Sequence, residues 1–153
     1  MPDLTLEQRL EQDIKEALLS GDKTRATTLR TIKAVLLNVK VAKGKREEGL
    51  SDEEVLQVFG KEAKKRQESA DLYVQGGDQA RADAELAEKA IIGKYLPAQL
   101  SEAEIAALVD EVIKNTGAQG AAAMGQVIGQ VKSKAGAAAD GSLIAKIAKE
   151  KLQ

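Results

Sequence analysis

The stretch Met124-Gly-Gln-Val-Ile-Gly-Gln-Val131, followed by Gly136 and by Ala139-Asp-Gly141, decides the fold of the carboxy-terminal part of the chain. Its apolar residues recur at the spacing i, i+3, i+4 and i+7, which predicts one buried face of an amphipathic helix: Met124, Val127, Ile128 and Val131. Gly136 is expected to stop this helix in a left-handed conformation, and Asp140 to cap a last apolar helix. The stretch therefore predicts two helices joined by a tight loop.

Two glycines lie four residues apart on the first of these helices. Gly125 and Gly129 each cost about 1 kcal/mol of helix stability relative to alanine, and the missing Cβ lets another backbone approach closely. We expect the pair to let a neighbouring helix pack against this one. A role facing a ligand is the alternative.

Composition favours an all-α protein without the usual catalytic side chains. The 153 residues are 43% hydrophobic but only 2% aromatic, and they include neither cysteine nor histidine. Thiol and imidazole catalysis, disulfides and Cys/His metal clusters are therefore excluded. We expect a protein with no cofactor. No apolar run reaches the roughly 18 residues of a membrane-spanning helix, so a cytoplasmic location without a membrane partner is expected.

Helix-start signals divide the rest of the chain. Three capping boxes begin at Thr5, Ser51 and Ser101, and two further N-caps are expected at Asp22 and Asp78. Pro97 breaks the helical pattern. We therefore expect a four-helix, bundle-like domain over residues 1–96 and a three-helix domain over 97–153.

Side-chain spacing makes two further predictions in the amino-terminal part. Arg66 falls on the apolar stripe of the helix that begins after Ser51, so we expect it to be half buried and paired with a carboxylate, and we expect Arg30 to be paired likewise. Contact with RNA is the alternative for both arginines. The alanine-rich helix over 78–95 is expected to bury these residues: Ala80, Ala84, Ala87 and Ile91.

Three separated motifs resemble one family. They are Gly21-Asp-Lys-Thr-Arg25 leading into Thr28-Leu-Arg-Thr-Ile32, the junction Tyr95-Leu-Pro-Ala-Gln-Leu-Ser101, and the glycine-containing tail from Met124. Together they resemble the GatB/YqeY family in its stand-alone YqeY-like form. The resemblance departs at Asp78 and Ala138, where the family commonly has arginine.

The resemblance implies a function connected with tRNA. The tail is shared with the B subunit of tRNA-dependent amidotransferases, where it lies against the outer elbow of tRNA. The implied function is a non-catalytic accessory that binds tRNA or an aminoacyl-tRNA-handling enzyme, with no DNA partner. The alternatives are a carbon-nitrogen ligase that uses glutamine as amido donor, and a purely protein-binding adaptor.

Charge distribution locates the candidate RNA-binding residues. Residues 22–66 contain 12 basic and 7 acidic side chains, a surplus of +5 in a chain of net charge −1. A solvated surface is the alternative explanation of this surplus. With the tail, the candidate tRNA-binding residues are Lys40, Lys43, Lys64, Lys65, Gly125, Gly129, Lys132, Lys134 and Gly136.

Overall fold

The computed structural model describes residues 3–153, and all regular structure in that range is helical, which confirms the all-α prediction. A 3₁₀ turn precedes α6, and another follows it. The α-helices are α1 (Leu6–Ser20), α2 (Lys23–Ala42), α3 (Asp52–Gln75), α4 (Gln79–Gly93), α5 (Glu102–Thr116), α6 (Met124–Ala135) and α7 (Gly141–Leu152). Within the described range, no helix is both long enough and apolar enough to cross a membrane.

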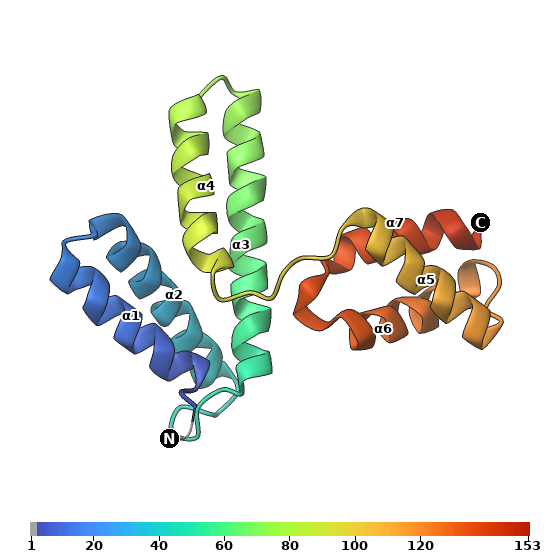
Figure 1. The fold of residues 1–153 in the computed structure, drawn as a ribbon, viewed down its shortest axis with the longest axis horizontal. Helices are drawn as coiled ribbons and strands as arrows, with labels where there is room; N and C mark the ends of the chain where they lie inside the picture. The colour runs from blue at the N-terminus through green and yellow to red at the C-terminus, as the bar shows by residue number, and fades with distance from the viewer. Residues whose placement is uncertain (1–2) are drawn as a thin grey trace. The chain divides into compact units, whose positions relative to one another are not determined.

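The chain divides into two compact units between Leu96 and Pro97. In the first unit, α1 and α2 form one helical hairpin, and α3 and α4 form a longer one (Figure 1). Gly21 ends α1 in the left-handed conformation, at φ 75° and ψ 15°. The Asp22 carboxylate then accepts a hydrogen bond from the Arg25 amide and caps α2.

The core of the first unit joins both hairpins, but only along part of their length. It contains Leu10 and Ile14 of α1, apolar residues of α2, and the first three turns of α3 as far as Ala63. Ile92 and Tyr95 close it from the end of α4, with the Tyr95 ring edge-on to Phe59 at 5.0 Å between centroids. The outer halves of α3 and α4 lie beyond this core.

The outer half of the α3/α4 hairpin is built around small and polar residues. Ala70 and Ala82 are buried there. Of the predicted inward face of α4, Ile91 is partly buried and packs against the core, but the prediction is wrong for Ala80, Ala84 and Ala87, which are exposed. An alanine-rich helix has little contrast between its faces, so its spacing does not determine which side packs. The inward side instead carries Ala82, Glu85, Lys89 and Ile92.

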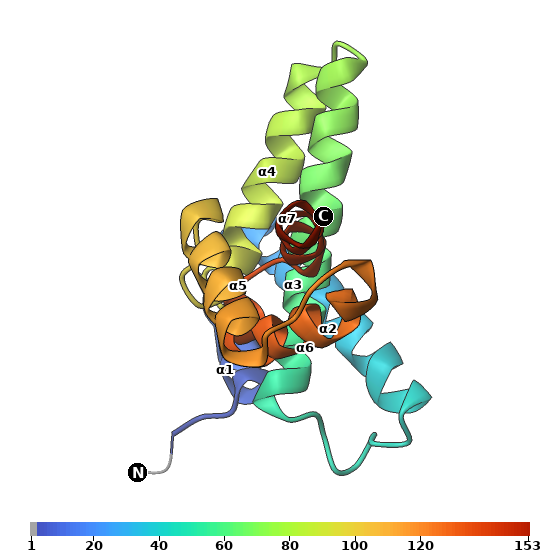
Figure 2. The same ribbon diagram turned by 90° about the vertical axis from the view of Figure 1, so that its right-hand side faces the viewer.

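The second unit packs α5, α6 and α7 around a core of its own (Figure 2). Val127 and Val131 of α6 are fully buried in it, as the spacing predicted. Gly136 ends α6 with positive φ, but its ψ of −136° lies outside the left-handed helical region that was predicted. The Asp140 carboxylate accepts from the Ser142 amide and caps α7, as predicted.

Capping chemistry fixes most helix starts. The reciprocal hydrogen bonds of a capping box are present at Thr5 with Gln8 and at Ser51 with Glu54. At Ser101 the hydroxyl caps the Glu104 amide and donates to the Glu104 carboxylate, so the Ser101 amide lacks the return bond that the sequence predicted.

Candidate nucleic-acid interface

The glycines of α6 lie on its exposed face. The side chains of Val127 and Val131 point into the core, and positions two residues away from them face roughly the opposite side of the helix. Gly125 and Gly129 are therefore exposed, and a Cβ added to either would meet no atom within 4 Å in the described chain beyond its chain neighbours and the nearby backbone of α6 itself. The expected close packing of another helix on these glycines is wrong, because α5 and α7 cover the opposite face.

Lys132 extends the glycine face toward the start of α7. Its Cε and Nζ lie 3.0 and 3.2 Å from the place where a Cβ on Gly141 would be. The ammonium group thus lies over the first turn of α7, where backbone amides lack helical partners. Within residues 3–153 Lys132 has no carboxylate partner. Lys134, in contrast, is bound to Glu111 at 2.9 Å.

Three of the candidate lysines in the first unit contact carboxylates. The Lys40 ammonium lies 2.5 Å from a carboxylate oxygen of Glu7 and Lys43 3.8 Å from Glu54. Lys65 lies 3.3 Å from Glu62. Lys64 is half buried and also has an interaction within the chain. Glu54 and Glu62 are already counted in the charge balance of residues 22–66, so of these pairs only the one with Glu7 reduces the surplus of +5.

The carboxylate of Glu54, in α3, binds the loop between α2 and α3. Its carboxylate accepts a hydrogen bond from Lys45 at 2.7 Å, and this bond lowers the pKa of Glu54 and raises that of Lys45. Glu7 also reaches this loop and accepts from the Leu50 amide. The two carboxylates fix the loop against the start of α1 and the start of α3.

Arg66 is paired, as its place on the apolar stripe predicted, and it is buried rather than half buried. Its Nη1 donates to the Glu62 carboxylate at 2.8 Å, and its Nε lies 3.6 Å from Glu88 of α4. Burial alone would raise the pKa of Glu62, but hydrogen bonds from Arg66 and Lys65 outweigh it, so that pKa is lowered. The group has the geometry of a structural ion pair that joins α3 to α4.

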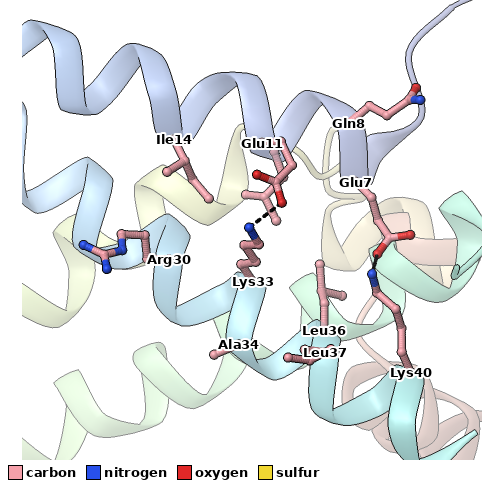
Figure 3. A pocket seen from close by; sticks show the side chains of 11 residues that line it. Glu7, Gln8, Glu11, Ile14, Arg30, Lys33, Ala34, Leu36, Leu37 and Lys40 are labelled. Atoms are coloured by element: carbon pink, nitrogen blue, oxygen red, sulfur yellow. Dashed lines mark ion pairs between the residues drawn. The ribbon is translucent and has the colours of Figure 1, made fainter. Parts of the chain in front are cut away.

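A groove of about 600 Å³ runs between α1 and α2. Its floor is apolar, with Leu10, Ile14 and Leu36, and two ion pairs bridge the helices along it, Glu11 with Lys33 and Glu7 with Lys40 (Figure 3).

Arg30 lies at the end of this groove away from Lys40 (Figure 3). The prediction that Arg30 pairs with a carboxylate is wrong within the described residues, because its exposed guanidinium has no such partner there. The sequence contained a signal for this difference, because Glu62 lies four residues before Arg66, whereas no acidic residue lies within four residues of Arg30.

The exposed glycine tail, the capped turn at Asp22 and the Tyr95 to Ser101 junction all lie within one sequence match. The family model for Yqey-like proteins matches residues 7–152. The chain belongs to the YqeY-like family. Comparison of this YqeY-like chain with curated proteins found no match. The family assignment confirms the resemblance drawn from the three motifs.

The sequence analysis overlooked two features of this YqeY-like chain. One is the groove between α1 and α2, and the other is a small pocket around Tyr95 that brings together side chains of α1, α2 and the end of α4. Contacts between residues so far apart in sequence leave no local pattern. Residues 3–153 contain no group of three or more acidic, histidine or cysteine side chains able to hold a metal ion.

Proposed function

We propose that the protein is a non-catalytic accessory that binds the tRNA backbone through the exposed face of α6. The observation that carries this proposal is the exposure of Gly125 and Gly129. Each costs helix stability, and no described part of the chain uses the space that the missing Cβ leaves. A phosphate backbone that approaches this face would occupy the space left by the missing Cβ atoms.

The charges around the glycine face suit a phosphate group. Lys132 supplies a cation over the first turn of α7, where free backbone amides and the helix dipole favour an anion. The Asp140 carboxylate accepts a hydrogen bond from the Ser142 amide and places one negative charge near this site. Contacts of this kind position an RNA backbone without reading its bases, so affinity is expected to be similar for different tRNAs.

The experiment is a comparison of stability and tRNA binding in Gly129→Ala. Gly129 lies inside α6 with open space at its Cβ position, so alanine is expected to stabilise the second unit by about 1 kcal/mol. The same methyl group would hold a phosphate backbone away and weaken tRNA binding about fivefold, the equivalent of one hydrogen bond. Thermal unfolding and fluorescence anisotropy with bulk tRNA measure the two effects.

The matched control is Asn115→Ala. Asn115 is exposed on α5, and alanine there also raises helix propensity while leaving the α6 face unchanged. We expect it to leave tRNA affinity unaltered. Wild-type affinity should fall as salt rises, since phosphate contacts release counterions. Equal tRNA affinity in Gly129→Ala and wild type, or affinity indifferent to salt, would reject the proposal.

The α1/α2 groove favours a second candidate, an adaptor that docks on a tRNA-handling enzyme. Leu37 lines this groove and is 43% exposed, and Val41, one turn further along α2, is 58% exposed. The test is binding of a purified tRNA-dependent amidotransferase after nuclease treatment. Leu37→Glu should abolish such binding and leave tRNA binding unchanged. A complex that disappears with nuclease would count against the adaptor.

A further inference from the structure

A small pocket in the first unit gathers positive charge around one tyrosine. It has a volume of about 90 Å³ and is lined by Arg9 and Asp13 of α1, Arg25 of α2, and Ile91, Lys94 and Tyr95 at the end of α4. Three of these side chains are cationic and one is a carboxylate. None of the three cations belongs to the surface proposed above for tRNA.

The Asp13 carboxylate does not use up the hydrogen-bonding capacity of the two arginines. Tyr95 donates its hydroxyl hydrogen to Asp13. The guanidinium nitrogens of Arg9 and Arg25 stay 3.7 and 3.6 Å from Asp13, which is ion-pair distance but beyond a hydrogen bond. Arg25 also lies 3.7 Å from Glu16, an exposed carboxylate outside the pocket lining.

The pocket holds its arginines in place before any ligand arrives. Arg9 stacks on the Tyr95 ring at 4.7 Å from the ring centre, and Arg25 is three-quarters buried. Burial and the hydrogen bond to Asp13 raise the pKa of Tyr95, so it remains a neutral donor. Lys94 is exposed and has no ion-pair partner within residues 3–153. Two oriented guanidiniums and an ammonium group therefore face the pocket with donors available.

We propose that this pocket binds a single phosphate group, held by Arg9, Arg25 and Lys94. Guanidinium groups match the geometry of phosphate oxygens through paired N–H donors, and an ammonium group adds a point charge. The pocket volume of about 90 Å³ suits a small anion. The phosphate has two possible sources, a free or terminal phosphate and the phosphodiester of an RNA backbone, and the second source alone would link the pocket to the proposed tRNA binding.

The experiment titrates the full chain with inorganic phosphate at constant ionic strength and follows amide NMR shifts. Saturable shifts are expected around Arg9, Arg25 and Tyr95. Lys94→Gln should weaken binding about tenfold, the equivalent of one charge-assisted hydrogen bond. Lys15→Gln removes an exposed cation of α1 outside the pocket and should bind phosphate like wild type. Arg25→Gln, with its fold checked by circular dichroism, should weaken binding at least as much as Lys94→Gln.

Two oligoribonucleotides that differ only in a 5′-phosphate distinguish the sources. A preference for the phosphorylated strand that is lost in Lys94→Gln assigns the pocket to terminal phosphate, and equal binding that Lys94→Gln weakens assigns it to the backbone. Absence of saturable shifts with inorganic phosphate, or equal weakening in Lys94→Gln and Lys15→Gln, overturns the proposal. Loss of tRNA binding in Gly129→Ala leaves the inorganic phosphate result unaffected, so the two proposals fail independently.

Discussion

At the scale of single residues, the charge of Glu62 is expected to stabilise the first unit through a buried ion pair. Glu62 is 7% exposed as a whole residue, and its carboxylate faces the buried guanidinium of Arg66 at 2.8 Å. Glu62→Gln keeps the shape and the hydrogen bond from Arg66 to the backbone carbonyl of residue 62, but leaves Glu88, at 3.6 Å, as the carboxylate that faces the guanidinium. Breaking a buried ion pair from one side costs about 3 kcal/mol. We expect that loss in the free energy of unfolding, measured by urea denaturation.

The same pair should make stability depend on pH in a defined direction. The pKa of Glu62 is lowered from 4.5 in the folded protein, so its contribution is complete above about pH 4.5 and is lost as pH falls through the folded value. Wild type should therefore lose more stability than Glu62→Gln on acidification below pH 4.5. Glu68→Gln, an exposed change on the same helix, should follow wild type in both measurements. Equal pH dependence in Glu62→Gln and wild type would contradict this account.

At the scale of elements, the α3/α4 hairpin should differ in stability along its length. Its inner half shares the core that ends at Ala63, whereas its outer half is held by pairwise contacts around Ala70 and Ala82. Segments with fewer buried apolar contacts open more readily. We expect amides of residues 70–74 and 82–86 to exchange with solvent at least about tenfold faster than those of 56–63. Uniform protection from Val55 to Tyr73, measured by native-state hydrogen exchange, would show that the hairpin opens as one piece.

The helix boundaries were predictable from sequence because capping is local chemistry. Thr5, Asp22 and Ser51 each bond an amide three residues away, so a short stretch of sequence contains the whole interaction. The packed face of α4 was not predictable, because alanine suits either side of a helix. The ion pairs of the candidate site were not predictable either, because Lys40 pairs with Glu7, which lies 33 residues earlier in the sequence. The place of Gly129 on the side of α6 away from the valines followed from their spacing, but the helix expected to pack on it is absent from the described chain, and only the structure showed that side to be exposed.

At the scale of the whole molecule, the chain contains two hydrophobic cores built from different residues. One core is formed by residues between Leu10 and Tyr95, and the other by residues between Ile105 and Leu152. The two proposed anion-binding surfaces follow the same division. The small pocket around Tyr95 belongs to the first unit, and the exposed face of α6 with Gly125 and Gly129 belongs to the second. Each surface can therefore be altered without changing the core that supports the other.

Because the two cores are separate, a cavity made in one core should destabilise only the unit that contains it. Ile144 is fully buried in the second core, and Ile144→Ala should destabilise that unit by about 2–5 kcal/mol. Because no residue of the second core belongs to the first, we expect the amides of α1–α4 to keep wild-type hydrogen-exchange protection while those of α5–α7 lose it. The reciprocal change Ile32→Ala should produce the opposite pattern. Loss of protection in both units from either substitution would show that the two cores unfold as one cooperative structure.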